Sequence, residues 1–396
     1  MGSERRDVWL LVLFSFPVGV SLGLRMVFFM PYLSMLGLTE AQMGLVAVAS
    51  SAAMALLAVP FGLLADLRGR KPFLLASRLL VASSDLMFFL IRSDLASLVL
   101  ANLLGGIGAS MIGASRQALL ADKTRGAWRK RAFTASSTAF AVGCMAGSIL
   151  AGFPELYVAL HPGVELLEAT RLLFLFCALS SFTAFLLLLP VAEERPKATV
   201  RGGSRFTIRS WRVIGSYCAF QALLGSGAGL VVPWFSYYFW RRFGVKLSSI
   251  GFLFAATQGL LALGSLSAYG LAIRLGDIRT AVLCQLVAVG LLLAIPASPF
   301  FALAAAFYVA RAVLMNMASP VVKAFYMGLL KREERGSASA LQLTAFWASR
   351  SLGTYGSGLL METFTLDTPF FACAALYMAA SALLYAAFQR EHERGG

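Results

Sequence analysis

Charged side chains are scarce in this sequence. Aspartate, glutamate, lysine and arginine together make up only 13% of its 396 residues, whereas 59% of the residues are hydrophobic. A soluble chain of this length needs a larger share of polar residues to cover its surface, and the mean hydropathy of +0.77 points the same way. The shortage of charge excludes a soluble globular protein and predicts a membrane protein.

Histidine and cysteine are also rare. The two histidines, His161 and His392, stand outside the apolar runs, which excludes a buried histidine proton relay. The five cysteines stand singly inside apolar runs, without a CxxC or Cys/His spacing, so we interpret them as packing residues. The sequence also lacks a phosphate-binding loop, a metal-ligand cluster and a paired nucleophile and base. We therefore expect neither an enzyme nor a bound metal or cofactor.

The charges that are present are mostly positive, with a formal net charge of +15. They form short clusters between apolar runs rather than a continuous basic face, so we expect no nucleic-acid partner. With a cytoplasmic N-terminus, the segments predicted to lie outside hold few bases, which are Arg92, Arg171, Arg241, Arg242 and Lys246. By the positive-inside rule, this asymmetry predicts a multi-pass protein of the cytoplasmic (inner) membrane with both termini in the cytoplasm.

Apolar runs long enough to cross a bilayer about 30 Å thick recur along the chain. We expect about twelve membrane-spanning helices, at residues 8–36, 42–64, 73–91, 95–118, 132–153, 169–190, 211–240, 249–273, 279–297, 299–327, 337–360 and 369–388. The first run is too long for a signal peptide and lacks a small-residue cleavage site, so we expect it to be retained.

The most polar connection, residues 192–211, follows the sixth predicted span. It predicts two six-helix bundles, residues 1–191 and 212–396, joined by a cytoplasmic linker. The halves also resemble each other. The stretches that begin at Leu38 and Leu247 both open on a polar cap, carry an early glycine and place a glycine before an arginine-containing loop. Such an internal repeat is typical of a duplicated bundle.

The loop between the second and third predicted spans reads "GLLADLRGRKPFLL", from Gly62 to Leu75. It resembles the loop between the second and third helices of the major facilitator superfamily of secondary transporters. Eight residues match that family's pattern, namely Gly62, Leu64, Ala65, Asp66, Gly69, Arg70, Lys71 and Leu75. Leu67 departs from it, because the family usually has a basic residue there; this chain has Arg68 one place later.

The resemblance spans the whole chain and implies an all-α membrane protein with twelve transmembrane helices in two pseudo-symmetric six-helix bundles, working by alternating access. It also implies an inner gate closed by charged helix ends. The candidate residues of this inner-gate motif are Gly62, Asp66, Gly69, Arg70, Lys71, Arg116, Asp122 and Arg131. We expect the charged residues Asp66, Arg70, Arg116, Asp122 and Arg131 to form one ionic cluster; the alternative for each is a solvated charge in a positive-inside loop.

Polar residues inside the spans mark the expected substrate cavity. An arginine near the middle of a span costs about 2.5 to 3.5 kcal/mol, so it usually faces a bundle interior or a wet cavity. By the resemblance, the first, fourth, seventh and tenth helices line that cavity. The candidates are Arg25, Arg311, Asn316, Gln221, Trp234, Tyr237, Tyr238 and, just behind the cavity, Arg350. Snorkelling or a bond to backbone carbonyls is the alternative for the arginines.

Asp85 is the one carboxylate clearly inside a predicted span. Two roles are open for it. It either pairs with an arginine, or it carries a coupling proton if desolvation favours its protonated form.

An interior with several arginines and few acids favours an anionic or zwitterionic solute. We therefore expect a monomeric secondary active transporter in the lipid bilayer, with a small organic solute and a coupling proton as its partners. One alternative is an exporter of drugs or lipid-like amphiphiles, suggested by the many phenylalanines and methionines; another is a receptor of the same fold that no longer transports. Proton-coupled drug exporters of the family have Arg, Gln and Pro where this chain has Asn102, Gly105 and Ser148, which weakens the export hypothesis.

Overall fold

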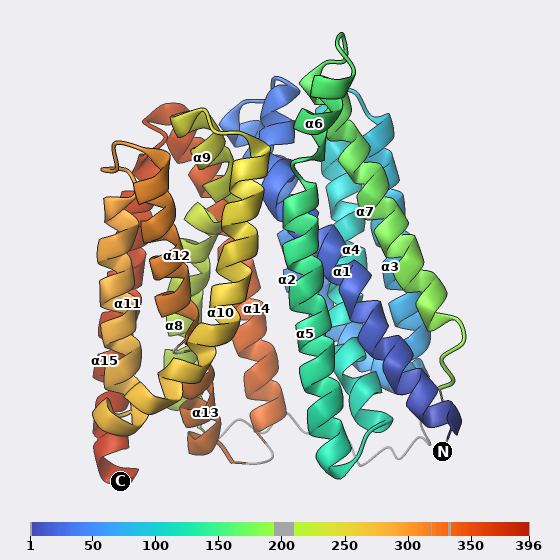
Figure 1. Cartoon of the computed structure of the whole chain (residues 1–396). Helices are drawn as coiled ribbons and strands as arrows, with labels where there is room; N and C mark the ends of the chain where they lie inside the picture. Colours follow the sequence, from blue (N-terminus) through green and yellow to red (C-terminus); the bar gives the residue numbers. More distant parts are fainter. Residues whose placement is uncertain (1, 194–209, 318, 332–333, 396) are drawn as a thin grey trace. The chain divides into compact units, whose positions relative to one another are not determined.

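The computed structural model describes residues 2–193, 210–317, 319–331 and 334–395, and every regular element in these ranges is a helix (Figure 1). The predicted linker, residues 192–211, lies outside the described residues except at its ends. The helices of the first half are α1 (Gly2–Met35), α2 (Glu40–Arg68), α3 (Arg70–Leu90), α4 (Leu95–Asp122), α5 (Gly126–Leu150), α6 (Phe153–Leu160) and α7 (Leu166–Leu188).

The second half continues the pattern. Its elements are α8 (Trp211–Val231), the 3-10 turn η1 (Val232–Trp234), α9 (Phe235–Phe243), α10 (Leu247–Leu275), α11 (Asp277–Ala294), α12 (Phe301–Met317), α13 (Ser319–Leu329), α14 (Arg335–Thr363) and α15 (Thr368–Gly395). Two of the predicted spans are interrupted among the described residues: α5 and α6 make up one span, and α8 and α9 make up another. The helices α12 and α13 also belong to one span. The break before α9 contains Pro233, which has no N–H for the helical ladder.

The predicted fold class, an all-α membrane protein, is confirmed. Ten segments of the described chain are long and apolar enough to cross a membrane, and α10 adds a shorter apolar stretch over Leu247–Leu261. The span of α14 is not among the ten, since its sequence is rich in serine, threonine and glycine. Several helices are longer than their predicted spans, because polar residues such as Arg68 and Asp122 continue the helix beyond the apolar run.

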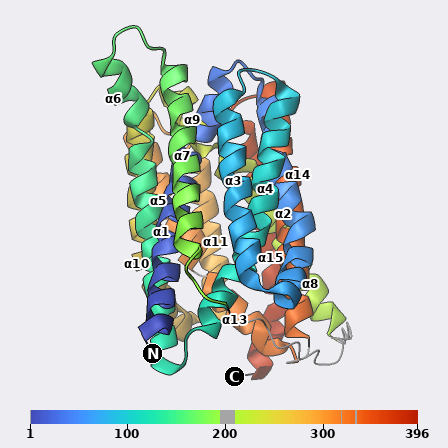
Figure 2. The same cartoon turned by 90° about the vertical axis from the view of Figure 1, so that its right-hand side faces the viewer.

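The described residues form two compact units. The first holds those of Met1–Val200 together with Gly244–Ala256, and the second holds the remainder. In the first unit, α3 packs against α4 and α7, and α1 packs against α5 and α7 (Figure 2). In the second unit, α8 packs against α14 and α15, and α11 packs against α12 and α15. Each unit thus has its own helical core.

The short segment Gly244–Ala256 belongs to the first unit although it opens the eighth predicted span. The carboxylate of Glu155 in α6 accepts hydrogen bonds from the Leu247 N–H at 2.5 Å, the Ser248 N–H at 3.3 Å and the Ser248 hydroxyl at 2.6 Å. The two N–H groups are among the unpaired backbone donors at the start of α10, where a negative charge is favourable. Glu155 therefore acts as the N-terminal cap of α10.

Glycines let the helices of the first unit approach closely. A Cβ at Gly19 or Gly23 of α1 would overlap the backbone of α5, and a Cβ at Gly143 or Gly147 of α5 would overlap the backbone of α1. Small residues at facing positions are the usual means of tight helix packing in membranes. The α1–α5 contact is therefore built from two pairs of glycines one helical turn apart.

The second unit repeats this device between α8 and α14. A Cβ at Gly229 would overlap the carbonyl oxygen of Arg350, and a Cβ at Gly353 would overlap that of Ser226. The same backbone contact thus holds α14, which carries Arg350, against α8.

Single glycines also form two of the turns. Gly69 has φ +101° and is the only residue between α2 and α3, and Gly276 has φ +84° and is the only residue between α10 and α11. Positive φ is a conformation that glycine adopts without strain. The turns occupy corresponding places in the two halves, in keeping with the internal repeat.

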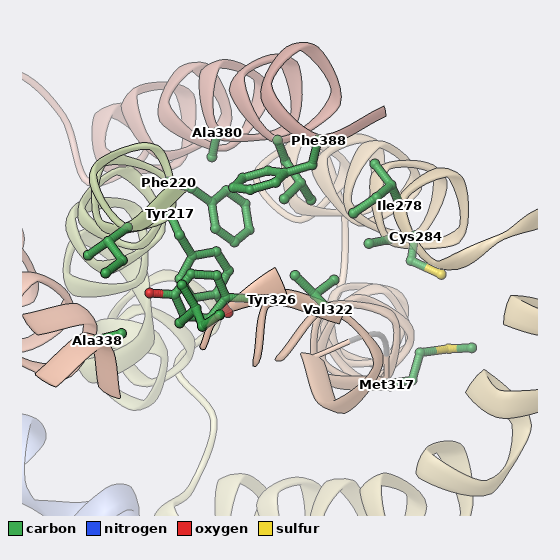
Figure 3. Packing of buried hydrophobic residues seen from close by; sticks show 14 residues of the cluster. Tyr217, Phe220, Ile278, Cys284, Met317, Val322, Tyr326, Ala338, Ala380 and Phe388 are labelled. Atoms are coloured by element: carbon green, nitrogen blue, oxygen red, sulfur yellow. The ribbon is translucent and has the colours of Figure 1, made fainter. Parts of the chain in front are cut away.

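An apolar cluster fills one end of the second unit (Figure 3). The rings of Tyr217 of α8 and Tyr326 of α13 stack with their centroids 3.8 Å apart, and Phe388 of α15 meets Tyr217 edge-on at 6.4 Å. Ile278 and Cys284 join the cluster from α11. Four separate helices are held together by these contacts, so the unit is a packed bundle.

We predict that Gly143→Ala destabilises the protein by about 1 to 3 kcal/mol, because the added methyl group forces the backbones of α1 and α5 apart. The melting temperature of the detergent-purified protein should fall. Gly290→Ala in α11 is the matched control, since a Cβ there meets nothing within 4 Å. Equal melting temperatures for the two variants would contradict the close α1–α5 contact.

Candidate functional site

A polar network crosses the interior of the first unit. The guanidinium of Arg25 in α1 donates one hydrogen bond to Asp85 Oδ1 of α3, at 2.6 Å, and another to Asn102 Oδ1 of α4, at 2.9 Å. The Asn102 amide in turn donates to the carbonyl oxygen of Val46 in α2, at 2.7 Å. Side chains from α1, α3 and α4 thus meet at one charged point, and the network reaches α2 through a backbone carbonyl.

Two aromatic rings lie against the guanidinium of Arg25. Its Cζ lies 4.8 Å from the centroid of Phe29 and 5.3 Å from that of Phe88, distances at which a cation is attracted to a ring face. Phe88 also stacks on Phe174 of α7 at 5.0 Å. The rings hold Arg25 in place and exclude water from part of the network.

The side chains of Arg25 and Asp85 differ in their exposure. Asp85 is fully buried, and its second oxygen, Oδ2, has no hydrogen-bond partner among the described residues. The Arg25 side chain is 18% exposed. The network therefore has an accessible cationic side and a buried carboxylate with one free acceptor.

A second charged group lies at the turn between α2 and α3. Arg70 forms ion pairs with Asp66, at 2.9 Å, and with Asp122 at the end of α4. The backbone N–H groups of Arg70 and Lys71 donate to the carboxylate of Glu193, at 2.6 and 2.9 Å. This carboxylate caps the start of α3, so the turn is held from both sides.

The ionic cluster is smaller than expected from the sequence. Arg116 does not reach it: its guanidinium donates to the Ser15 hydroxyl at 3.4 Å and lies 5.3 Å from the ring of Phe140. Arg131 is exposed and makes no ion pair with any described residue. Lys71 donates to the carbonyl oxygen of Leu189 at 2.8 Å rather than to an acid. Gly62 is half-buried in the last turns of α2.

Two candidate arginines of the second unit lie well inside its spans. Arg311 of α12 is buried, with 4% exposure, and donates to the Tyr377 hydroxyl of α15 at 3.1 Å. Its Cζ lies 5.4 Å from the ring of Phe235 in α9. Arg350 of α14 is partly exposed and lies over the ring of Trp347 at 5.6 Å. Arg311, expected in the cavity, is the more deeply buried of the two, and Arg350, expected just behind it, is the more exposed.

The other predicted cavity residues are mostly packed. Trp234, Tyr237 and Tyr238 are buried to 2% exposure or less, with the Trp234 indole donating to the Thr354 carbonyl oxygen at 3.3 Å and the Tyr238 hydroxyl to Asp367 at 2.7 Å. Gln221 is half-buried and reaches the Tyr217 hydroxyl at 3.5 Å. Asn316 is exposed, and its amide donates to the Ala312 carbonyl of its own helix.

Several residues of these groups were missed by reasoning from the sequence. Tyr377 carries no signal of its own, since a tyrosine in an apolar run is ordinary. Asn102 was noticed only as a departure from the exporter pattern, although a lone amide in a span is itself a sign of a buried hydrogen bond. No cluster of three or more His, Cys, Asp or Glu suited to a metal ion occurs among the described residues.

The chain is similar to known transporters. The model of the family described as "Major Facilitator Superfamily" matches residues 9–227 of this chain. An uncharacterized MFS-type transporter of Methanocaldococcus jannaschii is 21% identical over 373 residues, which cover 91% of this chain and 93% of that relative.

Solved structures of transporters share the fold. A bacterial homologue of the human lysosomal transporter Spinster, inward-facing and unoccupied, has a TM-score of 0.80 at 16% identity, with 99% of this chain and 98% of that chain covered. A nucleoside transporter reaches 0.82 at 15% identity, covering 96% and 100%. A D-xylose-proton symporter reaches 0.72 at 14% identity, covering 96% of each chain.

We predict that Arg25 and Asp85 are energetically coupled. Arg25→Leu leaves a buried carboxylate without its counter-charge, and removing one partner of a buried pair typically costs about 3 to 5 kcal/mol. The double variant with Asp85→Leu should lose less stability than Arg25→Leu alone, measured by thermal unfolding of the purified protein. Arg92→Leu, at an exposed site, is the control. Losses that simply add would show that the pair does not act as a unit.

Proposed function

Since the chain belongs to the major facilitator superfamily and is a multi-pass membrane transporter rather than an enzyme, we propose that it carries a small organic solute with an anionic or zwitterionic group. Transport would proceed by alternating access of the two bundles to either side of the membrane. We further propose that it resides in the cytoplasmic membrane as a monomer with both termini in the cytoplasm, as the distribution of basic loops predicts.

The observation that carries the proposed solute class is the excess of positive charge inside the spans. Among the span arginines, Arg25 pairs with Asp85 and Arg171 pairs with Glu168. The other four have no hydrogen-bonded carboxylate partner among the described residues, and they are Arg78, Arg116, Arg311 and Arg350. Arg78 is buried and donates only to the Ser77 hydroxyl. Uncompensated charge in an apolar medium is unfavourable, and an anionic solute would relieve it.

The fold relatives support a small polar cargo. One is named as a nucleoside transporter and another as a D-xylose-proton symporter. At this low sequence identity, the similarity supports a shared fold only. The solute of this chain must therefore be inferred from its own side chains.

We propose Asp85 as the site of a coupling proton. The carboxylate is buried, and its Oδ2 is free to take a proton. Protonation there would cancel the attraction to Arg25 and release the guanidinium for a negatively charged group. Proton binding and anion binding would then favour each other, which is the requirement for coupling the two fluxes.

An exporter of lipophilic drugs or lipids is the second candidate, and the packing argues against it. A drug-binding cavity needs accessible aromatic faces, whereas Trp234, Tyr237 and Tyr238 are buried. A transport-inactive receptor is the third, and it predicts solute binding without flux.

We predict that proteoliposomes exchange a radiolabelled organic anion, chosen as the compound that most raises the melting temperature in a solute library. Net flux should respond to an imposed pH gradient in the parent protein. In Asp85→Asn it should be insensitive to the gradient, while exchange persists because exchange needs no net proton movement. Binding without exchange would identify a receptor; extrusion of lipophilic cations instead of anions would identify an exporter.

The group formed by Asp66, Arg70 and Asp122 supports a gating role distant from the solute. We predict that Asp66→Asn preserves membrane insertion and solute affinity but lowers the turnover rate several-fold, because it weakens an ion pair that orders the α2–α3 turn. Turnover and affinity are measured separately in proteoliposomes. Glu165→Gln, which removes an exposed acid from the start of α7, is the matched control. A change in affinity with unchanged turnover would contradict the gating role.

A further inference from the structure

Arg350 presents an unbonded guanidinium on a fixed backbone. Its carbonyl oxygen accepts a hydrogen bond from the Thr354 hydroxyl at 2.9 Å and packs against Gly229 of α8. Its guanidinium makes no hydrogen bond or ion pair with the described residues and lies over the ring of Trp347 at 5.6 Å. The backbone is thus immobilised while all five N–H donors remain available.

Arg311 adds a second positive charge behind Arg350. Its Nε is buried without a hydrogen-bond partner, although Nη2 donates to the Tyr377 hydroxyl at 3.1 Å. The charge of Arg311 acts on Arg350, and the hydroxyl group of Tyr377 lies within the electrostatic reach of both. Two like charges in an apolar interior repel each other, and an anion between or beside them would stabilise both.

The second unit offers these arginines no acid of its own. The carboxylates whose side chains are described lie at or near helix ends, and they belong to Asp277, Glu334, Glu362 and Asp367. Glu334 accepts from the backbone and hydroxyl of Ser210, at 3.0 and 2.9 Å. None of them pairs with Arg311 or Arg350, so the charge inside this unit stays positive.

The first unit shows which group pairs with an arginine in a similar environment. Arg25 lies against two aromatic rings, as Arg350 lies on one, and there the carboxylate of Asp85 meets the guanidinium at 2.6 Å. Arg350 has the ring without the carboxylate. A carboxylate group matches the planar fork of N–H donors that Arg350 presents.

A lipid headgroup does not suit this position. Arg350 follows the start of α14 at Arg335 by 15 residues and precedes its end at Thr363 by 13. At 1.5 Å per residue these are about 22 and 20 Å along the helix, far below the level of phosphate groups. The occupant must therefore be a solute that enters the protein.

We propose that Arg350, supported by Arg311, binds the carboxylate group of the transported solute, with the ring of Trp347 as the adjoining apolar surface. This assignment rests on the proposed function and deepens it, because it names the chemical group recognised by the second unit.

Iodide tests the site directly, since it is a weakly hydrated anion that quenches tryptophan fluorescence on contact. The contribution of Trp347 is obtained as the difference between the parent protein and Trp347→Phe at constant ionic strength. Neutral acrylamide measures the accessibility of the same ring. We expect the ratio of iodide to acrylamide quenching at Trp347 to fall several-fold in Arg350→Gln and to be largely retained in Arg350→Lys. Benzoate should suppress iodide quenching, and its neutral counterpart benzamide should not.

Arg92→Gln, which removes an exposed charge, should leave the ratio unchanged, and Tyr377→Phe should lower it in part by releasing Arg311. An unchanged ratio in Arg350→Gln, or a Trp347 closed to acrylamide in the parent, would overturn the proposal. Nanodiscs of neutral phosphatidylcholine are compared with discs containing phosphatidylglycerol. Loss of iodide quenching in the anionic discs would assign the site to a lipid and contradict a solute carboxylate.

Failure of this site and failure of the transport function are distinguishable. Iodide quenching measures anion binding and does not require transport. If quenching is intact but proteoliposomes show no exchange, the transport function is rejected and the proposed anion site at Arg350 stands. Exchange of an organic anion that is equally fast in Arg350→Gln rejects the site and keeps transport.

Discussion

The ion pair between Arg25 and Asp85 ties the helices of the first unit to one another through charge. An apolar span gives a charged side chain no water, so the charge must be compensated inside the protein. Here the compensation comes from another helix, with Asn102 from a third helix completing the hydrogen bonds. The register of α1, α3 and α4 is thereby fixed at one level. The second unit meets the same constraint differently: a hydroxyl group and aromatic rings contact Arg311, and none of the described acids pairs with it.

Close backbone contacts decide which polar groups can meet. Because glycines bring α1 onto α5 and α8 onto α14, the side chains beside these contacts have little freedom to turn away. Arg350 illustrates the effect: its own carbonyl is part of the glycine contact, so the direction of its side chain follows from the packing of α14. A rigid scaffold of this kind suits a binding site, where donors must hold their places before the solute arrives.

The sequence was sufficient for the fold class, for most of the spans and for the charged turn at Gly69. Long apolar runs and a glycine between charged residues are local signals, because the structure they predict depends only on residues that are near in sequence. Side-chain partners were not predictable in the same way. A helix turns by about 100° per residue, so a small error in its rotation moves a residue from a cavity to a core. This explains why Trp234, Tyr237 and Tyr238, expected to line a cavity, pack inside the second unit.

The partners of charged residues show the same limit. Asp85 had two open roles in the sequence because nothing local says which arginine faces it; Arg25, 60 residues away, is its ion-pair partner. Arg116 meets Ser15 rather than Asp66 or Asp122, since its position on α4 directs it into the bundle. Glu193 and Glu155, which cap helices distant in sequence, gave no signal, because capping within a helix is local but these contacts are not.

The one-residue turns at Gly69 and Gly276 leave no spare chain between the helices they join. An inserted residue would have to be absorbed by unwinding a helix end. The connection from His161 to Glu165 is the opposite case, with largely exposed side chains and Gly163 in open space. For protein engineering, this makes the His161–Glu165 connection the place for an epitope or a fluorophore, and the two glycine turns the places to leave intact.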